Sequence, residues 1–168
     1  MIYWLAVPAT VALAVLDVSA APSFTWLGVH PDLIVPWLGC WATIRGQQET
    51  TVLVAVAGLS LGLLAPEPLG AALLALLPLA GFAALAEQRL VRGRYLFTLL
   101  VVLVAGTLYP LLLAVFGLLG GDSLGPPLVL LRIAPRAAML DGVVAALWYW
   151  PLRLLVRRRA PLRGFGRA

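Results

Sequence analysis

The chain has 168 residues, of which 62% are hydrophobic and only 11% are charged. A soluble domain of this size carries about 25% charged residues, so a globule of this composition would expose apolar patches and aggregate in water. Disorder is excluded as well, because disordered chains combine low hydrophobicity with high charge. The composition therefore predicts an integral membrane protein with several spans.

The gaps between charged residues outline these spans, because a charged side chain is costly at the centre of a bilayer. A span needs about 20 apolar residues. The second candidate is short and contains Pro36, so it either begins earlier, near Trp26, or is a re-entrant or kinked element. We predict an all-α integral membrane protein whose single domain, residues 1–156, contains six helices at residues 2–20, 32–44, 50–65, 68–86, 95–119 and 137–156.

Residues 2–20 also have the apolar core and the following small residues of a secretory signal. Such signals begin with basic residues, whereas none precedes this apolar run and Asp17 lies inside it. We therefore expect a retained first helix.

The arginines orient the six predicted helices through the positive-inside rule. If both chain ends are cytoplasmic, the outer loops carry only Arg132 and Arg136. The basic tail, residues 157–168, is either a topology signal alone or a binding element for anionic lipid headgroups. The other ten of the 12 arginines then lie on the inner side: Arg45, Arg89, Arg92, Arg94, Arg153, Arg157, Arg158, Arg159, Arg163 and Arg167.

Between the last two predicted helices lies a long connection, residues 120–135. Its glycines and prolines oppose a regular helix at its start, and its middle is apolar. We expect this segment to lie in the outer interface or to cover the bundle.

Ionisable groups inside a membrane are pointers to function, and two aspartates qualify. Asp17 lies near the outer end of the first predicted helix and Asp141 near the outer end of the last. At about 1.5 Å per residue, both lie roughly 5–6 Å below the outer boundary. If these helices are close, the two carboxyls share a proton, bond a hydroxyl, or meet Arg136. The alternatives are a polar cavity that opens outward and an ordinary helix–helix hydrogen bond.

Two stripes of small residues predict close helix packing. Gly58 and Gly62 form one stripe in the third predicted helix, and Ala138, Gly142 and Ala146 form the other in the last. Each stripe either packs helices within the bundle or contacts the transmembrane helix of another protein.

The chain has few residues that could carry catalysis or hold a metal. It contains one histidine, His30, one cysteine, Cys40, and no lysine, so neither a serine–lysine pair nor a Cys/His metal cluster is available. The carboxylates are scattered, and no P-loop or dinucleotide fingerprint occurs. We expect no enzyme, no cofactor and no nucleic-acid partner. A membrane scaffold and a small-molecule-binding transport subunit remain.

Short motifs in a fixed order resemble the rod shape-determining protein MreD family along most of the chain. The family places a polar residue at the end of its first helix, a Pro-Asp-Leu start before its second, and an Arg-Gly pair after it. It often has an aspartate at the end of its third helix, where this chain has Glu67. The matching residues are Asp17 with Pro22, Pro31-Asp32-Leu33, Arg45-Gly46, Gly58 with Gly62, Pro68-Leu69-Gly70, Pro135 and Asp141.

The resemblance implies a non-catalytic subunit of the bacterial cell-elongation complex in the inner membrane. Members of the family associate with the bitopic protein MreC, and through it with the MreB cytoskeleton, a RodA-type glycosyltransferase and a class B penicillin-binding protein. The implied mechanism is that small-residue faces, such as those of Gly58 and Gly142, hold the single helix of an MreC-like partner.

The family also resembles in fold the substrate-binding subunits of energy-coupling-factor vitamin transporters. Such a subunit is the alternative function. Those subunits commonly dock their coupling protein through an Ala-x-x-x-Ala stripe on the first helix, and residues 2–20 contain no such pair.

Overall fold

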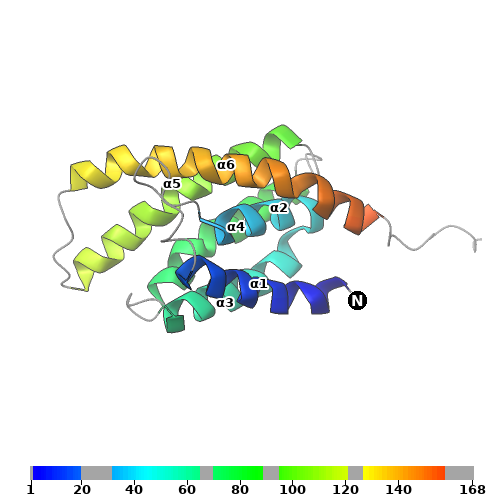
Figure 1. Ribbon diagram of the computed structural model, residues 1–168, viewed down its shortest axis with the longest axis horizontal. Helices are drawn as coiled ribbons and strands as arrows, with labels where there is room; N and C mark the ends of the chain where they lie inside the picture. Colours follow the sequence, from blue (N-terminus) through cyan, green and yellow to red (C-terminus); the bar gives the residue numbers. More distant parts are fainter. Residues whose placement is uncertain (1, 20–31, 65–69, 89–94, 121–126, 158–168) are drawn as a thin grey trace, which may run out of the picture.

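Six helices make up almost all of the residues that the computed structural model describes, which are 2–19, 32–64, 70–88, 95–120 and 127–157 (Figure 1). The prediction of an all-helical protein is therefore confirmed for this part of the chain. The helices are α1 (Ile2–Ser19), α2 (Ile34–Arg45), α3 (Gln47–Leu64), α4 (Ala71–Gln88), α5 (Tyr95–Leu119) and α6 (Pro127–Arg157).

Within the described residues, three helical segments are long and apolar enough to cross a membrane. They are Gln47–Leu64, Tyr95–Leu119 and Ile133–Leu155. Two further apolar stretches, Trp4–Ser19 and Ala71–Glu87, are shorter. The helices thus support the assignment to the membrane, and the start of α1 and the end of α6 lie at the same end of the bundle (Figure 1).

Helix α2 is shorter than a membrane span, with 12 residues or about 18 Å of length. It begins at Ile34, so Pro36 occupies its first turn, where a missing N–H removes no intrahelical hydrogen bond. Residues 20–31, which include Trp26, lie outside the described part of the chain.

A single glycine separates α2 from α3. Gly46 has φ 98°, a conformation that L side chains rarely adopt, and α3 begins directly after it at Gln47. The sequence predicts a longer connection, residues 45–49, because a charged residue such as Glu49 is expected outside a membrane span. In the structure Glu49 lies in the first turn of α3, where the helix dipole favours a negative charge.

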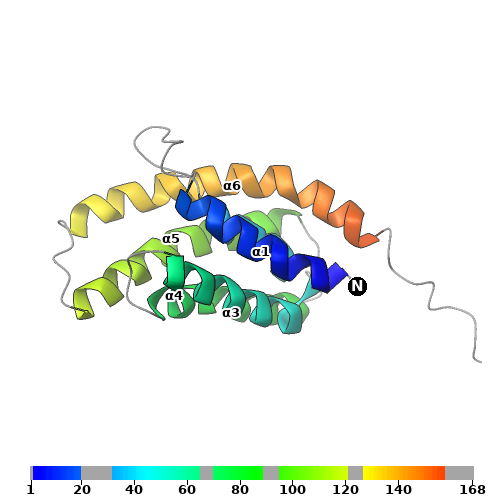
Figure 2. The same ribbon diagram turned by 60° about the horizontal axis from the view of Figure 1, so that its bottom comes forward.

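Helix α6 begins ten residues before its predicted start at residue 137, so the long connection predicted over residues 120–135 is helical from residue 127 onward. Pro127 is the first residue of the helix, and proline is favoured there because its φ already fits. Pro135 and Pro151 lie inside α6, and each removes one backbone hydrogen bond. The helix runs in an arc over the bundle (Figure 2), as expected of a helix bent at prolines.

Helix α2 lies at the centre of the bundle and packs against each of the other five helices. Nine of its 12 residues are buried. The other helices follow one another around it in the order α1, α3, α4, α5 and α6, each packed on the next. The core is therefore built around the most buried element of the fold.

Large apolar side chains cover the outside of the bundle. Trp4 of α1 and Leu96 of α5 are each 78% exposed, and α3, α4 and α6 also present leucines outward. No residue of α2 belongs to this exposed apolar set. An apolar exterior around a packed core is the arrangement expected of a protein surrounded by lipid.

Candidate functional site

Three aspartates meet at the N-terminus of α2. Asp32, two residues before the helix, accepts hydrogen bonds from the backbone N–H groups of Ile34 at 2.8 Å and Val35 at 3.1 Å. These N–H groups belong to the first turn of a helix and have no intrahelical acceptor. A side-chain oxygen in this position caps the helix.

The other two aspartates come from helices that are distant in the sequence. Asp17 of α1 accepts the N–H of Leu33, and Asp141 of α6 accepts the N–H of Asp32, both at 2.9 Å. Four successive N–H groups, those of residues 32–35, are thus bound by carboxylates from three parts of the chain. We call Asp17, Asp32 and Asp141 the aspartate clamp.

The clamp stabilises the junction of α1, α2 and α6. Asp141 is buried, with 1% of its surface exposed, and a buried N–H that loses its acceptor costs about 1–3 kcal/mol. The negative charges of Asp32 and Asp17 both act against a negative charge on the Asp141 carboxyl. The positive end of the α2 dipole and the four N–H groups offset this repulsion.

The sequence placed Asp17 and Asp141 at matching depth, and the structure brings both to neighbouring backbone positions of one helix. Their described partners are backbone N–H groups, which sequence reasoning had not considered. Arg136, offered as an ion-pair partner, is exposed on α6. The sequence marks Asp32 as part of the Pro-Asp-Leu motif, and its role as the acceptor for the first N–H groups of α2 was missed.

Gly106 of α5 makes room for the clamp. A Cβ atom at this position would lie 2.8 Å from Oδ2 of Asp141 and 3.3 Å from Cα of Ala138. The first distance is shorter than real Cβ contacts, so a larger residue here would require the Asp141 carboxyl to shift.

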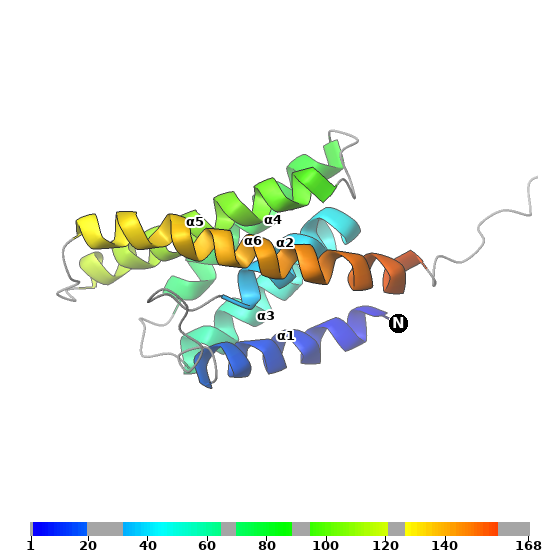
Figure 3. The ribbon, with the colours of Figure 1, turned by 45° about the horizontal axis from the view of Figure 1, so that its top comes forward.

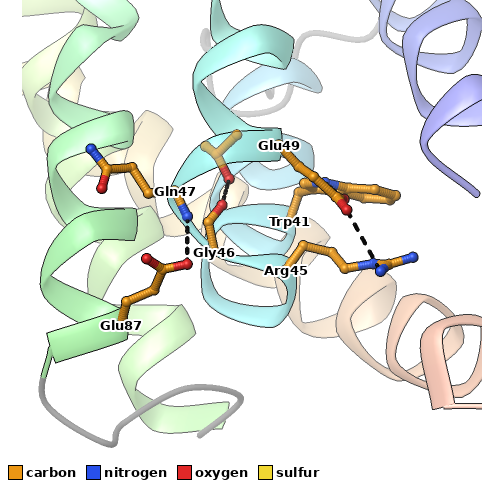
Figure 4. A network of polar contacts seen from close by, with 7 residues as sticks. Trp41, Arg45, Gly46, Gln47, Glu49 and Glu87 are labelled. Carbon is orange, nitrogen blue, oxygen red and sulfur yellow. Dashed lines mark hydrogen bonds and ion pairs between the residues drawn. The ribbon is translucent and has the colours of Figure 1, made fainter. Parts of the chain in front are cut away.

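A second polar network lies at the other end of α2 (Figure 4). Arg45 forms an ion pair with Glu49 at 3.6 Å, and its guanidinium lies over the Trp41 ring at 5.9 Å. The Trp41 indole donates to Glu49 at 3.2 Å. Thr50 donates its hydroxyl to the carbonyl of Gly46 at 2.7 Å, which holds the turn between α2 and α3.

Glu87 of α4 completes this network, because it accepts the N–H of Gln47 at 3.1 Å and so caps α3 from another helix (Figure 4). We expect Glu87→Ala to lower the free energy of unfolding by about 1 kcal/mol, the usual cost of a lost cap. Glu87→Gln keeps an acceptor oxygen and should lose less. Unfolding midpoints in mixed detergent micelles measure both, with Gln48→Ala as a control at an exposed neighbour. Equal losses from the Glu87→Ala and Gln48→Ala variants would contradict the capping role.

Trp37 connects three helices. Its indole donates to the Thr10 hydroxyl of α1 at 3.0 Å, and its ring packs edge-on against Trp148 of α6 with centroids 5.5 Å apart. Trp41 lies one turn further along α2, and the centroids of its ring and the Trp37 ring are 5.5 Å apart. The two tryptophans of α2 thus share a face, as their spacing predicts.

The two small-residue stripes lie inside the bundle. A Cβ atom on Gly58 would lie 2.5 Å from Cα of Leu73, so the first stripe packs α3 on α4. Ala138 and Gly142 are buried, and Gly142 faces Leu103 of α5. The remaining members are Gly62, which is buried, and Ala146, which is half-buried.

Helices of this chain lie against Gly58 and Gly142, so neither residue presents a free face to a partner helix in this arrangement. The alternative that the sequence left open, packing within the bundle, describes their position.

Sequence reasoning missed a third stripe on α1. Ala6, Thr10 and Ala14 are spaced four residues apart and are all buried, where α1 packs on α3 and α2. Their spacing is regular, but the central threonine hides the stripe from a pattern of glycine and alanine alone. Sequence reasoning also missed the hydroxyls of Thr43 and Thr98, which are 2.8 Å apart and link α2 to α5.

Residues of the family resemblance gather at the two ends of α2. Asp32 and Leu33 belong to its start, and Arg45 and Gly46 to its end. Pro31 lies outside the described residues, as do Pro22, Glu67, Pro68 and Leu69. Of the tail at 157–168, only Arg157 is described, as the last residue of α6.

Among the described residues, no group of three histidine, cysteine or acidic side chains could hold a metal ion. In the clamp, the described bonds of the carboxyl oxygens run to backbone N–H groups, so the arrangement holds helices together. No family model, no curated protein and no solved structure matches this chain.

Proposed function

We propose that this protein is a non-catalytic scaffold subunit that crosses the bacterial inner membrane six times, with both ends in the cytoplasm. The apolar exterior of the helices supports the proposal that lipid surrounds the protein. Three helical segments of the described chain also have the length and composition of a span. The shorter helices α1 and α4 complete the bundle through their packing on α3.

The charges support the proposed orientation. Arg45 lies at the end of the bundle where α2 ends and α3 begins, and the aspartate clamp lies at the other end of α2. In the proposed six-span order, the arginines between α4 and α5 and those of the basic tail belong to the side of Arg45, and Arg132 and Arg136 belong to the side of the clamp. Positive charge gathers on the cytoplasmic side of membrane proteins, so the first of these ends is the inner one.

The two polar networks explain how a helix as short as α2 is accommodated. Its length of about 18 Å falls short of the roughly 30 Å hydrocarbon core, so its ends lie at membrane depth. Backbone that is not helical is tolerated there only when protein surrounds it and satisfies its polar groups. The aspartate clamp does this at one end, and the buried hydroxyl of Thr50, which donates to the carbonyl of Gly46, does it at the other.

The observation that carries the function is the aspartate clamp. It joins Asp17, Asp32 and Asp141, three positions at which the sequence resembles the MreD family, into one junction of α1, α2 and α6. The described bonds of the clamp carboxyls cap a helix and join three helices, and this structural use supports a scaffold. In this proposal the protein binds an MreC-like bitopic partner, and through it supports the glycosyltransferase and transpeptidase that build the cell wall.

Affinity purification of the tagged chain in mild detergent tests this function. We expect an MreC-like protein to co-purify, together with a RodA-type glycosyltransferase or a class B penicillin-binding protein. A co-purified ATPase pair and a bound vitamin would instead establish the transport subunit and contradict the proposal. An unrelated tagged membrane protein of similar size serves as the control for detergent carry-over.

A further inference from the structure

The ring of helices around α2 is open at one place. The helices α1, α3, α4, α5 and α6 pack on one another in this order, but α1 and α6 share no extensive interface within the described residues. Figure 3 shows α1 and α6 apart, with parts of α2 and α3 visible between them. We call the surface between these two helices, where Trp37 of α2 contacts both, the α1–α6 seam.

One face of α2 forms the floor of the seam. Its start and its last turns contain partly buried residues, Leu33, Trp37 and Ile44, spaced by four and seven residues. Four and seven residues are close to whole helical turns, so all three side chains point the same way. Trp37 contacts Thr10 of α1 and Trp148 of α6, which places this face between the two walls.

The seam is polar at its ends and apolar between them. At the outer end lie the partly buried carboxyls of Asp17 and Asp32. At the inner end Arg45 and Glu49 neutralise each other, with side chains 26% and 31% exposed. A ligand that follows the floor therefore meets negative charge outside, apolar side chains along Trp37 and Ile44, and a neutral pair inside.

We propose that the α1–α6 seam is the seat of a single apolar transmembrane helix of a partner protein, with a basic residue at its outer end facing Asp17 and Asp32. The open position lies between two helices and over a third, so a sixth helix in the ring would close it. The charge at the outer end selects a cation there. This inference rests on the proposed function and names the surface at which the MreC-like partner binds.

Site-specific photo-cross-linking tests the seat. Val144 lies one turn before Trp148 on the same face of α6 and is partly buried, so a benzoyl-phenylalanine there reports on the seam. Met139 of α6 and Leu77 of α4, which are 69% and 46% exposed, report on other faces of the bundle. We expect a cross-link to the partner's transmembrane helix from position 144 and none from positions 139 and 77.

A matched pair of substitutions tests the seat by blocking it. Val144→Trp fills the seam, whereas Val143→Trp adds the same side chain at an adjacent, 60% exposed position directed away from it. We expect Val144→Trp to lower the recovery of the partner about tenfold, as for loss of a central contact, and Val143→Trp to leave it unchanged.

The charge is tested by a double-mutant cycle. Changing the partner's outer basic residue to alanine should lower recovery of the partner about fivefold when it is purified with the wild-type chain. The loss should be far smaller with the Asp17→Asn variant, because the effects of mutating two interacting residues are not additive. Equal losses in both backgrounds would overturn the charge pairing.

Failure of the seam and failure of the proposed function give different results. If the partner co-purifies with the wild-type chain but cross-links from position 139 or 77 and not from 144, the seam is not its seat and the scaffold function stands. If no MreC-like partner co-purifies with the wild-type chain, both proposals fall.

Discussion

Replacing Asp141 with alanine should lower the free energy of unfolding by about 3 kcal/mol, the largest effect we expect from a single polar residue in this chain. The variant leaves the N–H of Asp32 without its acceptor in a site where Asp141 is only 1% exposed. It also separates α6 from the start of the central helix. Reversible unfolding in mixed detergent micelles measures the change.

A matched variant separates the hydrogen bond from other effects. Asp141→Asn keeps an oxygen in the position that accepts the N–H and removes the repulsion from Asp17 and Asp32. It should lose less than about 1 kcal/mol. Arg136→Ala, at an exposed position of the same helix, is the control for mutation in α6 as such. Alanine and asparagine variants of equal stability would show that the clamp does not hold the junction.

Gly58→Ala should be almost as destabilising, at about 2–3 kcal/mol, although it adds only one carbon atom. The new Cβ would lie 2.5 Å from Cα of Leu73, which is backbone and cannot turn aside. The helices α3 and α4 must separate, and the interface between them is one of the largest in the bundle. The same unfolding measurement in micelles applies.

Gly81 supplies the matched control for this substitution. It lies in α4, and a Cβ atom there meets nothing within 4 Å. Gly81→Ala should leave the protein unchanged or stabilise it by up to about 1 kcal/mol, because alanine restricts the unfolded chain and favours a helix. If Gly58→Ala were as well tolerated as Gly81→Ala, the close approach of α3 and α4 would be refuted.

The charges in the sequence predicted the positions of the helices well where both ends of a helix are marked. The fifth helix was predicted at residues 95–119 and is observed at Tyr95–Leu119, because Arg94 and Asp122 lie just beyond its ends. The start of α6 was misplaced because glycines and prolines precede it. Proline is a stop signal inside a helix and a favourable first residue, and the sequence pattern alone does not distinguish these roles.

The candidate site was predicted in part. Asp17 and Asp141 stood out because an ionisable residue in an apolar stretch is rare. Their partners were not predicted, because a backbone N–H group carries no mark in the sequence. The sequence also does not show that Gly39 and Gly106 make room for a neighbouring helix. A Cβ atom on Gly39 of α2 would lie 2.6 Å from Cγ2 of Val102, and only the packing of α5 on α2 reveals this.

The sequence by itself indicated a helical protein with segments apolar enough for a membrane, where those segments lie, and which few polar residues are embedded in them. These properties follow from composition and from the cost of placing charge in lipid, and both depend on each residue alone. Only the tertiary structure decided that α2 is the buried centre, that small-residue stripes face inward, and that α1 and α6 leave a seam. Those facts depend on which surfaces of the helices meet, and helices with similar apolar composition offer many surfaces of nearly equal transfer free energy. Close packing around Gly58 and Gly106, together with the satisfaction of the α2 backbone by Asp17, Asp32 and Asp141, selects one arrangement among them.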